Sequence, residues 1–397
     1  MLPLLASLLL SLQDAGAPRL VLEDLAGKTS ELPLKDLALS DPRERGAWIV
    51  RPEGLTRAAG ETPPGELAVL TLTSGDELRG RVRGGQGESL ELELIGAVVV
   101  PIDISALVRL DFPTRVTAER VLEPASEGDR LYRRTGGALD AIDGTIEGFS
   151  AAGVTMASAL GTKTIPWGEV AALRVEVLGG SAVPAPALKV PVRVDLSDGS
   201  RVRGALLGLD AERCRIALGG EHEVALPLAS VLELTVDDGR LVYLSELAPL
   251  SESGRGAPFG DELGMVWPHR MDANVLGDPL RAGERTYRRG VGMHAPSALT
   301  FALDGERRTL RGAVAIDDSA RINGAGARGS VVFRVRKDGA LAWESPLVRG
   351  GDAPLPLPEL ELGGAHELVL EVDPAGDFAG DRADWLRMVL VRPAEAR

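Results

Sequence analysis

The sequence predicts an all-β protein in which about three small β-barrel-like repeats precede a larger β-sandwich. Its apolar residues fall in short runs that alternate with polar ones, the period of two that is typical of half-buried strands. Glycine (48 residues) and proline (26 residues) separate these runs along the 397-residue chain, which favours many turns and few long helices. Because hydrophobic residues make up 44% of the chain, we expect packed cores rather than disorder.

The chain begins with an apolar segment that is typical of an export signal. Leu2 to Leu12 is almost continuously apolar but too short to cross a bilayer, and Ala15-Gly16-Ala17 offers small residues for cleavage. We therefore expect residues 1–17 to be a signal peptide and the protein to be exported to the periplasm, the cell envelope or the extracellular space. An N-terminal core helix is the alternative for this segment. No later segment of the sequence indicates a membrane span.

Three stretches of the middle region show the same order of strand-like runs. We place them at residues 18–112 (with a leader), 129–177 and 190–240. In each, a glycine in the second run precedes a proline by a similar distance: 21 residues from Gly80 to Pro101, 22 from Gly144 to Pro166 and 23 from Gly204 to Pro227. Each stretch has room for about five short strands, a pattern that resembles small SH3 or Sm-like barrels.

The third stretch shows the strand pattern most clearly. Every second residue from Val190 to Leu196 is apolar, and Asp198-Gly199 then favours a hairpin turn. The glycine of the second run indicates a bulge or sharp bend. The leader, residues 18–60, contains a strand around Leu20-Val21-Leu22, and we expect it to complete the first barrel. Cys214, the single cysteine, lies on the apolar side of an alternating run, so we expect a buried and unreactive thiol.

The pattern of apolar and polar residues changes in the C-terminal third of the chain, which we place at residues 255–395. Alternating runs there have the number and spacing of a β-sandwich. Four sequence motifs follow one another in this region: Gly290-Val291-Gly292-Met293-His294-Ala295-Pro296-Ser297, then Ile316-Asp317-Asp318, then Gly329 to Val335 with Asp338-Gly339, and finally Asp381-Arg382-Ala383-Asp384-Trp385.

These four motifs, in this order, resemble the signature of the NPCBM family of carbohydrate-binding modules. The resemblance covers about a third of the chain. It implies a galactose-binding-like jelly-roll sandwich that binds galactose-containing glycans, often beside a structural calcium ion. Domains of this type commonly accompany glycoside hydrolases, whereas the N-terminal part resembles no enzyme family.

A sugar site needs an aromatic ring to stack on the pyranose and fixed polar groups for its hydroxyls. The residues of these types in the C-terminal third are the candidate carbohydrate-binding residues Trp267, Asp272, His294, Asp317, Asp384 and Trp385. Structural roles compete with this interpretation. His294 can instead bond a neighbouring loop, and Trp385 precedes an apolar strand and can instead be a core residue.

Carboxylates in turns near the C-terminus are candidates for the calcium ion that the resemblance implies. Asp377 and Asp381 are of the type that calcium prefers, since it takes six to eight oxygen ligands from such loops. The alternative is that these aspartates cap backbone N–H groups in solvated turns.

The net charge and the sequence motifs disfavour several classes of function. The net charge of −14 disfavours nucleic acid as a partner, because an acidic surface repels phosphates. The sequence shows no catalytic signature of a hydrolase elbow, a zinc protease or a phosphate-binding loop, and we predict no enzyme activity. The main hypothesis is glycan binding, with the small barrels as spacers or protein-docking repeats. A scaffold whose sandwich no longer binds sugar is the second hypothesis, and an enzyme with a site between barrels is the third.

Overall fold

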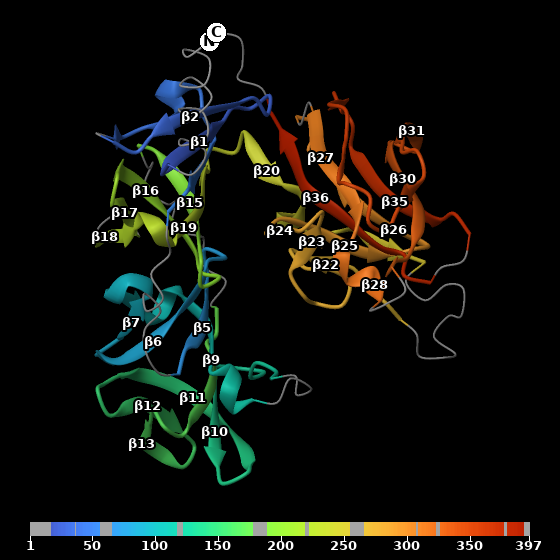
Figure 1. Cartoon of the computed structure of the whole chain (residues 1–397). Helices are drawn as coiled ribbons and strands as arrows, with labels where there is room; N and C mark the ends of the chain where they lie inside the picture. The colour runs from blue at the N-terminus through green and yellow to red at the C-terminus, as the bar shows by residue number, and fades with distance from the viewer. Residues whose placement is uncertain are drawn as a thin grey trace. The chain divides into compact units, whose positions relative to one another are not determined.

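The computed structural model describes residues 17–35, 37–55, 66–116, 122–177, 189–218, 222–254, 266–306, 309–322, 326–376 and 379–392. The chain divides into two compact units, Met1–Asp238 and Gly239–Arg397. The all-β prediction is confirmed (Figure 1): strands alternate with turns and with short 3-10 segments at Pro42–Arg45 (η1), Ile95–Ala97 (η2), Ile104–Ala106 (η3), Pro113–Arg115 (η4), Leu228–Ser230 (η5), Leu244–Glu246 (η6) and Asp318–Ala320 (η8).

Within the described ranges, no helix has the length and apolar character needed to span a bilayer. Residues 1–16 of the expected signal peptide lie outside the described residues, so that expectation stays a prediction.

The N-terminal unit contains three five-stranded antiparallel repeats with one common plan. Their strands are as follows: in repeat 1, β5 (Ala68–Leu72), β6 (Glu77–Gln86), β7 (Ser89–Leu94), β8 (Val98–Asp103) and β9 (Leu107–Asp111); in repeat 2, β10 (Asp129–Thr135), β11 (Ala138–Phe149), β12 (Gly153–Ser158), β13 (Gly161–Pro166) and β14 (Val170–Arg174); in repeat 3, β15 (Pro191–Leu196), β16 (Arg201–Asp210), β17 (Arg213–Leu218), β18 (His222–Pro227) and β19 (Val231–Val236).

In every repeat the first strand pairs with both the second and the fifth strand. Leu70, Leu131 and Val194 of the first strands pair with Leu110, Leu173 and Leu234 of the fifth strands, respectively. All six side chains are fully buried in one continuous apolar core. The inward positions of the alternating pattern therefore build this core.

The glycines singled out in the second strands are required for close approach of the neighbouring strand. A Cβ on Gly144 would lie 1.9 Å from the carbonyl oxygen of Ala157, and one on Gly80 or Gly204 would lie 2.5 Å from a backbone oxygen. The bulge itself comes later than expected, where the register shifts just before a second glycine: Gly84, Gly148 and Gly208 in the three repeats. The bend therefore belongs to the second glycine, not the first.

The leader forms β1 (Arg19–Glu23), β2 (Thr29–Pro33), β3 (Ala38–Leu39) and β4 (Ile49–Glu53). The expectation that it completes the first barrel is wrong. Strand β4 pairs with β19, and β3 pairs with β16, so the leader joins repeat 3. It also follows the repeat plan in shortened form, because β1 pairs with both β2 and β4.

The turn after the first strand supports this relationship between the leader and the repeats. Gly27 follows Leu22 by five residues, as Gly75 follows Leu70 and Gly199 follows Val194. The three glycines have φ of 82°, 80° and 93°, a left-handed conformation that favours glycine. The leader is thus a fourth, truncated repeat, in which β3 and η1 stand between its second strand and its last.

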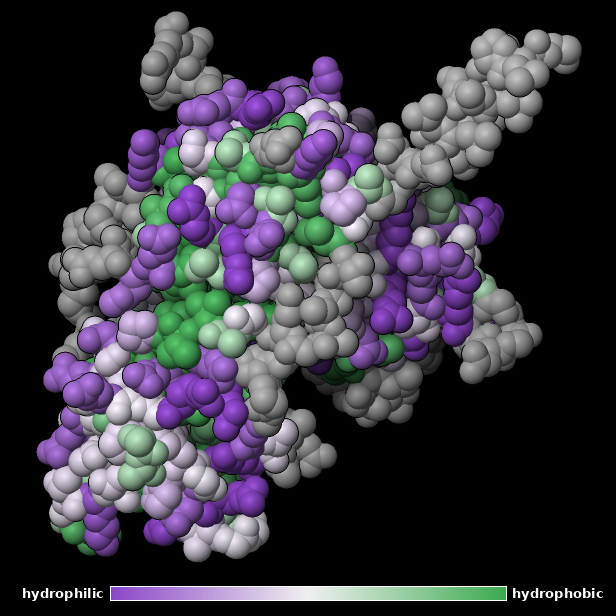
Figure 2. Space-filling view, turned by 60° about the vertical axis from the view of Figure 1, so that its left-hand side comes forward, coloured by the Kyte–Doolittle hydropathy of each residue, from purple (hydrophilic) through white to green (hydrophobic). Residues whose placement is uncertain are grey.

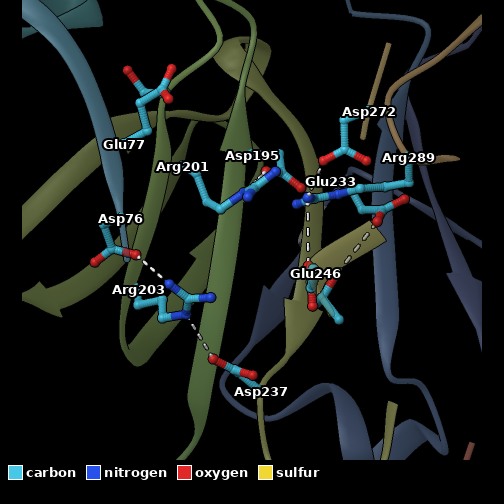
Figure 3. Close-up of polar contacts among 12 residues, drawn as sticks. Asp76, Glu77, Asp195, Arg201, Arg203, Glu233, Asp237, Glu246, Asp272 and Arg289 are labelled. Carbon is cyan, nitrogen blue, oxygen red and sulfur yellow. Dashed lines mark hydrogen bonds and ion pairs between the residues drawn. The ribbon is translucent and has the colours of Figure 1, made fainter. Parts of the chain in front are cut away.

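Repeats 1 and 3 contact each other through equivalent turns. Arg203 Nη1 lies 3.1 Å from Asp76 Oδ1, and the Arg203 Nε lies 3.2 Å from Asp237 Oδ2 (Figure 3). In the reverse sense, the backbone N–H of Arg79 donates to Ser200 Oγ at 2.9 Å. Asp76 and Arg79 of repeat 1 occupy the positions of Ser200 and Arg203 of repeat 3, so the contact is nearly two-fold symmetric.

The C-terminal unit is a sandwich of two antiparallel sheets. The first sheet contains β20 (Leu241–Tyr243), β22 (Arg270–Met271), β25 (Gly290–His294), β27 (Thr309–Ile316), β33 (Leu355–Pro356), β34 (Leu360–Glu361) and β36 (Arg382–Val391). The second contains β21 (Ser251–Ser253), β26 (Ser297–Ala302), β30 (Ser330–Lys337), β31 (Ala340–Glu344), β32 (Val348–Arg349) and β35 (Glu367–Pro374). Two further pairs are β23 (Leu280–Ala282) with β24 (Arg285–Tyr287) and β28 (Arg321–Ile322) with β29 (Gly326–Ala327).

The sandwich begins earlier in the chain than residue 255. Strand β20 pairs with the last strand, β36, through Leu241 opposite Val391. Both residues are buried. The unit therefore closes by pairing its first and last strands, and residues before 255 belong to it.

Hydrophilic side chains cover most of the face in Figure 2, and hydrophobic ones gather in patches between them. The most exposed large hydrophobic residue in the described ranges is Leu160, which is 88% exposed in the turn between β12 and β13. Scattered exposed hydrophobic residues are ordinary for a folded protein and indicate no site by themselves.

Candidate functional site

The ring of Trp267 stacks on the ring of His294 at one edge of the sandwich. Their centroids are 4.5 Å apart and their planes differ by 16°. His294 is the last residue of β25 and is buried, whereas Trp267 lies three residues before β22 and is half-buried. Two of the candidate residues from the sequence therefore meet, and a flat indole packs on an imidazole.

His294 is neutral at physiological pH. Burial lowers the pKa of its ring, and the nearby guanidinium of Arg382 lowers it further, although the hydrogen bond to Ala295 opposes this. Nδ1 lies 2.8 Å from the carbonyl oxygen of Ala295. A carbonyl can only accept, so Nδ1 carries the proton and Nε2 keeps an acceptor lone pair.

Residues next to the two rings hold them in place. Glu252 of β21 accepts a hydrogen bond from the backbone N–H of His269 at 2.6 Å, and its other oxygen lies 3.1 Å from His269 Nδ1. These two contacts hold the backbone and the side chain of His269, two residues after Trp267. Arg382 is opposite His294 in the strand register, and its guanidinium donates to the carbonyl of Ser319 at 2.6 Å. Sequence reasoning missed Glu252, His269 and Arg382, although Arg382 lies inside one of the recognised motifs.

Asp272 lies at the other end of β25 from His294. It accepts hydrogen bonds from the backbone N–H of Gly290 at 3.2 Å and from Arg289 Nη1 at 3.0 Å (Figure 3). Arg289 Nη1 also lies 3.5 Å from Glu246. Because Gly290 and His294 are four residues apart on one strand, the two places are roughly 13 Å apart. Asp272 therefore does not join Trp267 and His294, and its backbone φ of 56° marks it as a turn residue.

Asp317 anchors the β23–β24 hairpin, which covers the outer face of the first sheet. Its carboxylate accepts hydrogen bonds from Asn274 Nδ2 at 3.0 Å, from the Arg281 N–H at 2.8 Å and from the Ser319 N–H at 2.9 Å. The side chain is buried, with 1% of its surface exposed. Its role is to anchor the loop, and its burial removes it from the sugar site.

The glycines of the first motif serve the same covering segment. A Cβ on Gly292 would lie 2.5 Å from the carbonyl oxygen of Ala273, and one on Gly290 would lie 2.8 Å from Leu280. The motif therefore lets the covering segment pack directly on β25, which explains these glycines without a ligand.

Asp384 is also buried rather than exposed to a ligand. It lies on β36 with 1% of its surface exposed, and neither of its carboxylate oxygens receives a donor from the described residues. Burial raises the pKa of Asp384 well above its ordinary value, and the adjacent Asp317 and Asp318 add to the shift. An un-ionised Asp384 carboxyl or a bound cation would satisfy this environment.

Trp385 belongs to the core between the two sheets. It is fully buried, and its ring meets that of Phe333 edge-on with centroids 5.0 Å apart and planes at 87°. The stacking role expected for it is therefore wrong in this structure. The reason is strand alternation, which turns Trp385 inward and its neighbour Asp384 to the opposite face.

The expected calcium ligands are not brought together. Asp377 lies outside the described residues, and Asp381 is buried and accepts the backbone N–H of Ser330 at 2.7 Å. Within the part of the chain that the structure describes, no three His, Cys, Asp or Glu side chains are grouped to hold a metal ion. Asp384 is a better candidate than Asp381, since its carboxylate has no donor. Calcium stays a prediction.

A two-sheet sandwich that holds an aromatic ring beside a neutral histidine and a guanidinium offers the apolar face and the polar groups that a sugar site needs. The family model of the NPCBM/NEW2 domain matches residues 240–391. This part of the chain is thus an NPCBM domain, and its first residue agrees with the start of β20.

Comparison with known proteins gives partial matches. A stretch of 121 residues, 30% of this chain, is 34% identical to an alpha-1,3-galactosidase B of Akkermansia muciniphila, of which it spans only 14%. Among solved structures, a CBM51 domain from the Clostridium perfringens GH95 protein, solved with methyl-galactose, is 25% identical and has a TM-score of 0.32; the match covers 38% of this chain and 99% of that one. The second CBM51 with INT domains of Clostridium perfringens ZmpB, solved with GlcNAc, is 22% identical with a TM-score of 0.34, covering 46% and 37%.

Proposed function

We propose that the C-terminal unit binds a glycan at the Trp267–His294 platform. The observation that supports this most is the parallel stack of the two rings, which presents an indole in one fixed orientation. An aromatic face packs against the C–H groups of a pyranose, and a rigid ring loses little entropy on binding. His294 Nε2 would accept a hydroxyl proton, and Arg382 would donate to a hydroxyl oxygen.

Galactose-containing glycans are the ligands we propose to test first. The NPCBM match and the identity to part of a galactosidase support this choice. We further propose that the protein is exported and non-catalytic, and that the repeats of the N-terminal unit, which we compare to SH3-like barrels, act as spacers or as a protein-docking surface. The apolar segment from Leu2 to Leu12 supports export.

The direct test is calorimetric titration of the full chain with methyl-galactoside and lactose, with and without calcium. Trp267→Ala should weaken binding by roughly tenfold or more, since it removes the stacking surface. Trp343→Ala is the matched control, because Trp343 is also half-buried in this unit but lies on β31 of the other sheet.

Two outcomes would count against the proposal. If Trp343→Ala and Trp267→Ala weaken binding equally, the platform is not the site. If no galactoside or amino-sugar glycan on an array binds the folded chain, the scaffold hypothesis replaces glycan binding. Release of free sugar from these glycans by the purified chain would overturn the non-catalytic assignment.

A further inference from the structure

Two junctions in the N-terminal unit are equivalent residue by residue. Repeats 1 and 2 are joined where the last strands β9 and β14 pair antiparallel, with Leu110 opposite Leu173. The leader and repeat 3 are joined in the same way by β4 and β19, with Val50 opposite Leu234. All four residues hold the same position in their repeat, so each feature of one junction has a counterpart in the other.

In the first junction an arginine fills the space beyond the paired strands. The guanidinium of Arg115 donates to the backbone carbonyls of Trp167, in the turn before β14, and of Val170, the first residue of β14. Its Nε lies 3.0 and 2.9 Å from the two carboxylate oxygens of Glu66. The Arg115 guanidinium also lies 4.0 Å from the centroid of the Phe112 ring. Burial opposes ionisation of Glu66, but the hydrogen bonds from Arg115 and Thr114 lower its pKa.

The second junction lacks two features of the first: the backbone hydrogen bond after the paired strands, and the arginine that follows it. Phe112 donates its backbone N–H to Ala171 at 3.0 Å, but the equivalent residue is Pro52, which has no N–H to donate. The β4–β19 ladder accordingly has two residue pairs, whereas the β9–β14 ladder has three. Leu55 stands in the position of Arg115, so no guanidinium from that position reaches the turn.

A pocket of about 510 Å³ results at the second junction. The described residues that line it are Pro52, Glu53, Gly54, Leu55, Ala229 and Val231. Val231 holds the position of Val170, whose carbonyl binds Arg115 in the first junction. Glu53 supplies a carboxylate, as Glu66 does there, and its side chain is 44% exposed although Arg19 lies 3.0 Å away. Glu53 is the charged residue among the described lining residues, and its Arg19 partner lies outside that lining.

We propose that this pocket binds an arginine side chain presented by a partner protein, in the manner in which the first junction holds Arg115. The chemistry that recognises it is a flat cation with several N–H donors, received by backbone carbonyls and one carboxylate. This is a protein-docking role for the N-terminal unit, and it does not depend on glycan binding by the other unit.

The test uses the full chain and a defined probe, Nα-acetyl-arginine methylamide, titrated by calorimetry and NMR. The neutral citrulline analogue has nearly the same shape, so it should bind roughly tenfold more weakly or worse if the charge and donors matter. Ala229→Trp should fill the pocket and abolish binding. Ser105→Trp is the matched control, because Ser105 holds the position of Ala229 in repeat 1 and is exposed.

Arg115→Ala gives an independent readout, because it should open an equivalent pocket at the first junction. The probe should then bind at two sites instead of one. Equal affinity for the arginine and citrulline analogues, equal affinity for a lysine analogue, or binding that survives Ala229→Trp would overturn the proposal. Self-association of the wild-type chain that Ala229→Trp abolishes would assign the pocket to a second copy and overturn the assignment to a separate partner.

Discussion

The buried carboxyl of Asp384 lies beside that of Asp317, which is the better supplied with hydrogen-bond donors. Asp317 accepts three hydrogen bonds, whereas Asp384 receives none from the described residues. Two neighbouring buried carboxylates cannot both ionise without cost, so the less solvated one keeps its proton. The raised pKa of Asp384 follows from this arrangement, with desolvation as the larger cause.

Asp384→Asn should make the stability of the C-terminal unit less dependent on pH. A carboxyl whose pKa is raised in the folded state costs stability as pH rises from its unfolded value, about 3.9, towards its folded value. The wild-type unit should therefore lose stability over that window, and Asp384→Asn should remove this part of the loss. Thermal unfolding followed from pH 4 to pH 8 measures it. Parallel pH curves for the wild type and Asp384→Asn would contradict the assignment.

Calcium offers a second way to satisfy Asp384. If the ion binds there, millimolar calcium should raise the unfolding temperature of the wild-type C-terminal unit at pH 7.5 and should not raise that of Asp384→Asn. Magnesium, which demands a stricter geometry, is the control ion. A calcium response that is unchanged in Asp384→Asn would place the ion elsewhere.

Glycan affinity should be insensitive to pH until His294 is protonated. Burial lowers the pKa of this ring below its ordinary value of about 6.5, so affinity should fall as the pH becomes acidic, with a midpoint below pH 6.5. Protonation would remove the Nε2 acceptor and place a charge near Arg382. Titrations at half-unit pH steps test this, and His294→Gln should give weaker binding with a flat profile. A midpoint at or above 6.5 would contradict the environment described for His294.

Trp385→Ala should destabilise the C-terminal unit rather than act on glycan binding directly. Removal of a fully buried tryptophan from a core costs about 3–5 kcal/mol, and here it also removes the edge-on contact with Phe333. Chemical unfolding measures the loss, and Trp385→Phe should recover much of it. Where either variant remains folded, its glycan affinity should match that of the wild type. Weakened affinity in a folded Trp385→Phe variant would return this residue to the sugar site.

The sequence predicts structural features that depend on local signals, but not those that depend on strand pairings between distant segments. Alternation and turn glycines are local signals, so the all-β class and the meeting of strands within each repeat could be predicted. The leader was misassigned because its second strand, Thr29–Pro33, is mostly exposed and lacks the alternating apolar pattern. The strands of repeat 3 with which the leader pairs, β16 and β19, are also distant in sequence, and no local signal specifies those pairings.

Some residues of the candidate site could likewise be predicted from local signals, and others could not. Trp267 and His294 could be predicted because aromatic and imidazole side chains in a recognised motif are ordinary ligand residues. Asp317 and Asp384 were misassigned to it because carboxylates are usually exposed, and only the covering hairpin, formed by residues 30 or more positions away, buries them. The Arg115 junction and its open counterpart depend on pairings between repeats, which periodicity within one repeat does not reveal.

Gly144→Ala should destabilise the N-terminal unit, because the neighbouring strand leaves no room for a side chain. The added Cβ would lie 1.9 Å from the Ala157 carbonyl oxygen, so β11 and β12 would have to separate at the centre of repeat 2, at a cost of about 2–3 kcal/mol. Gly137→Ala is the matched control in the same repeat, since a Cβ there meets nothing within 4 Å and its φ is not positive. Urea unfolding of both variants measures the difference. Equal free energies of unfolding would show that the strands of repeat 2 are not held at this spacing, and the common plan of the repeats would lose its physical basis.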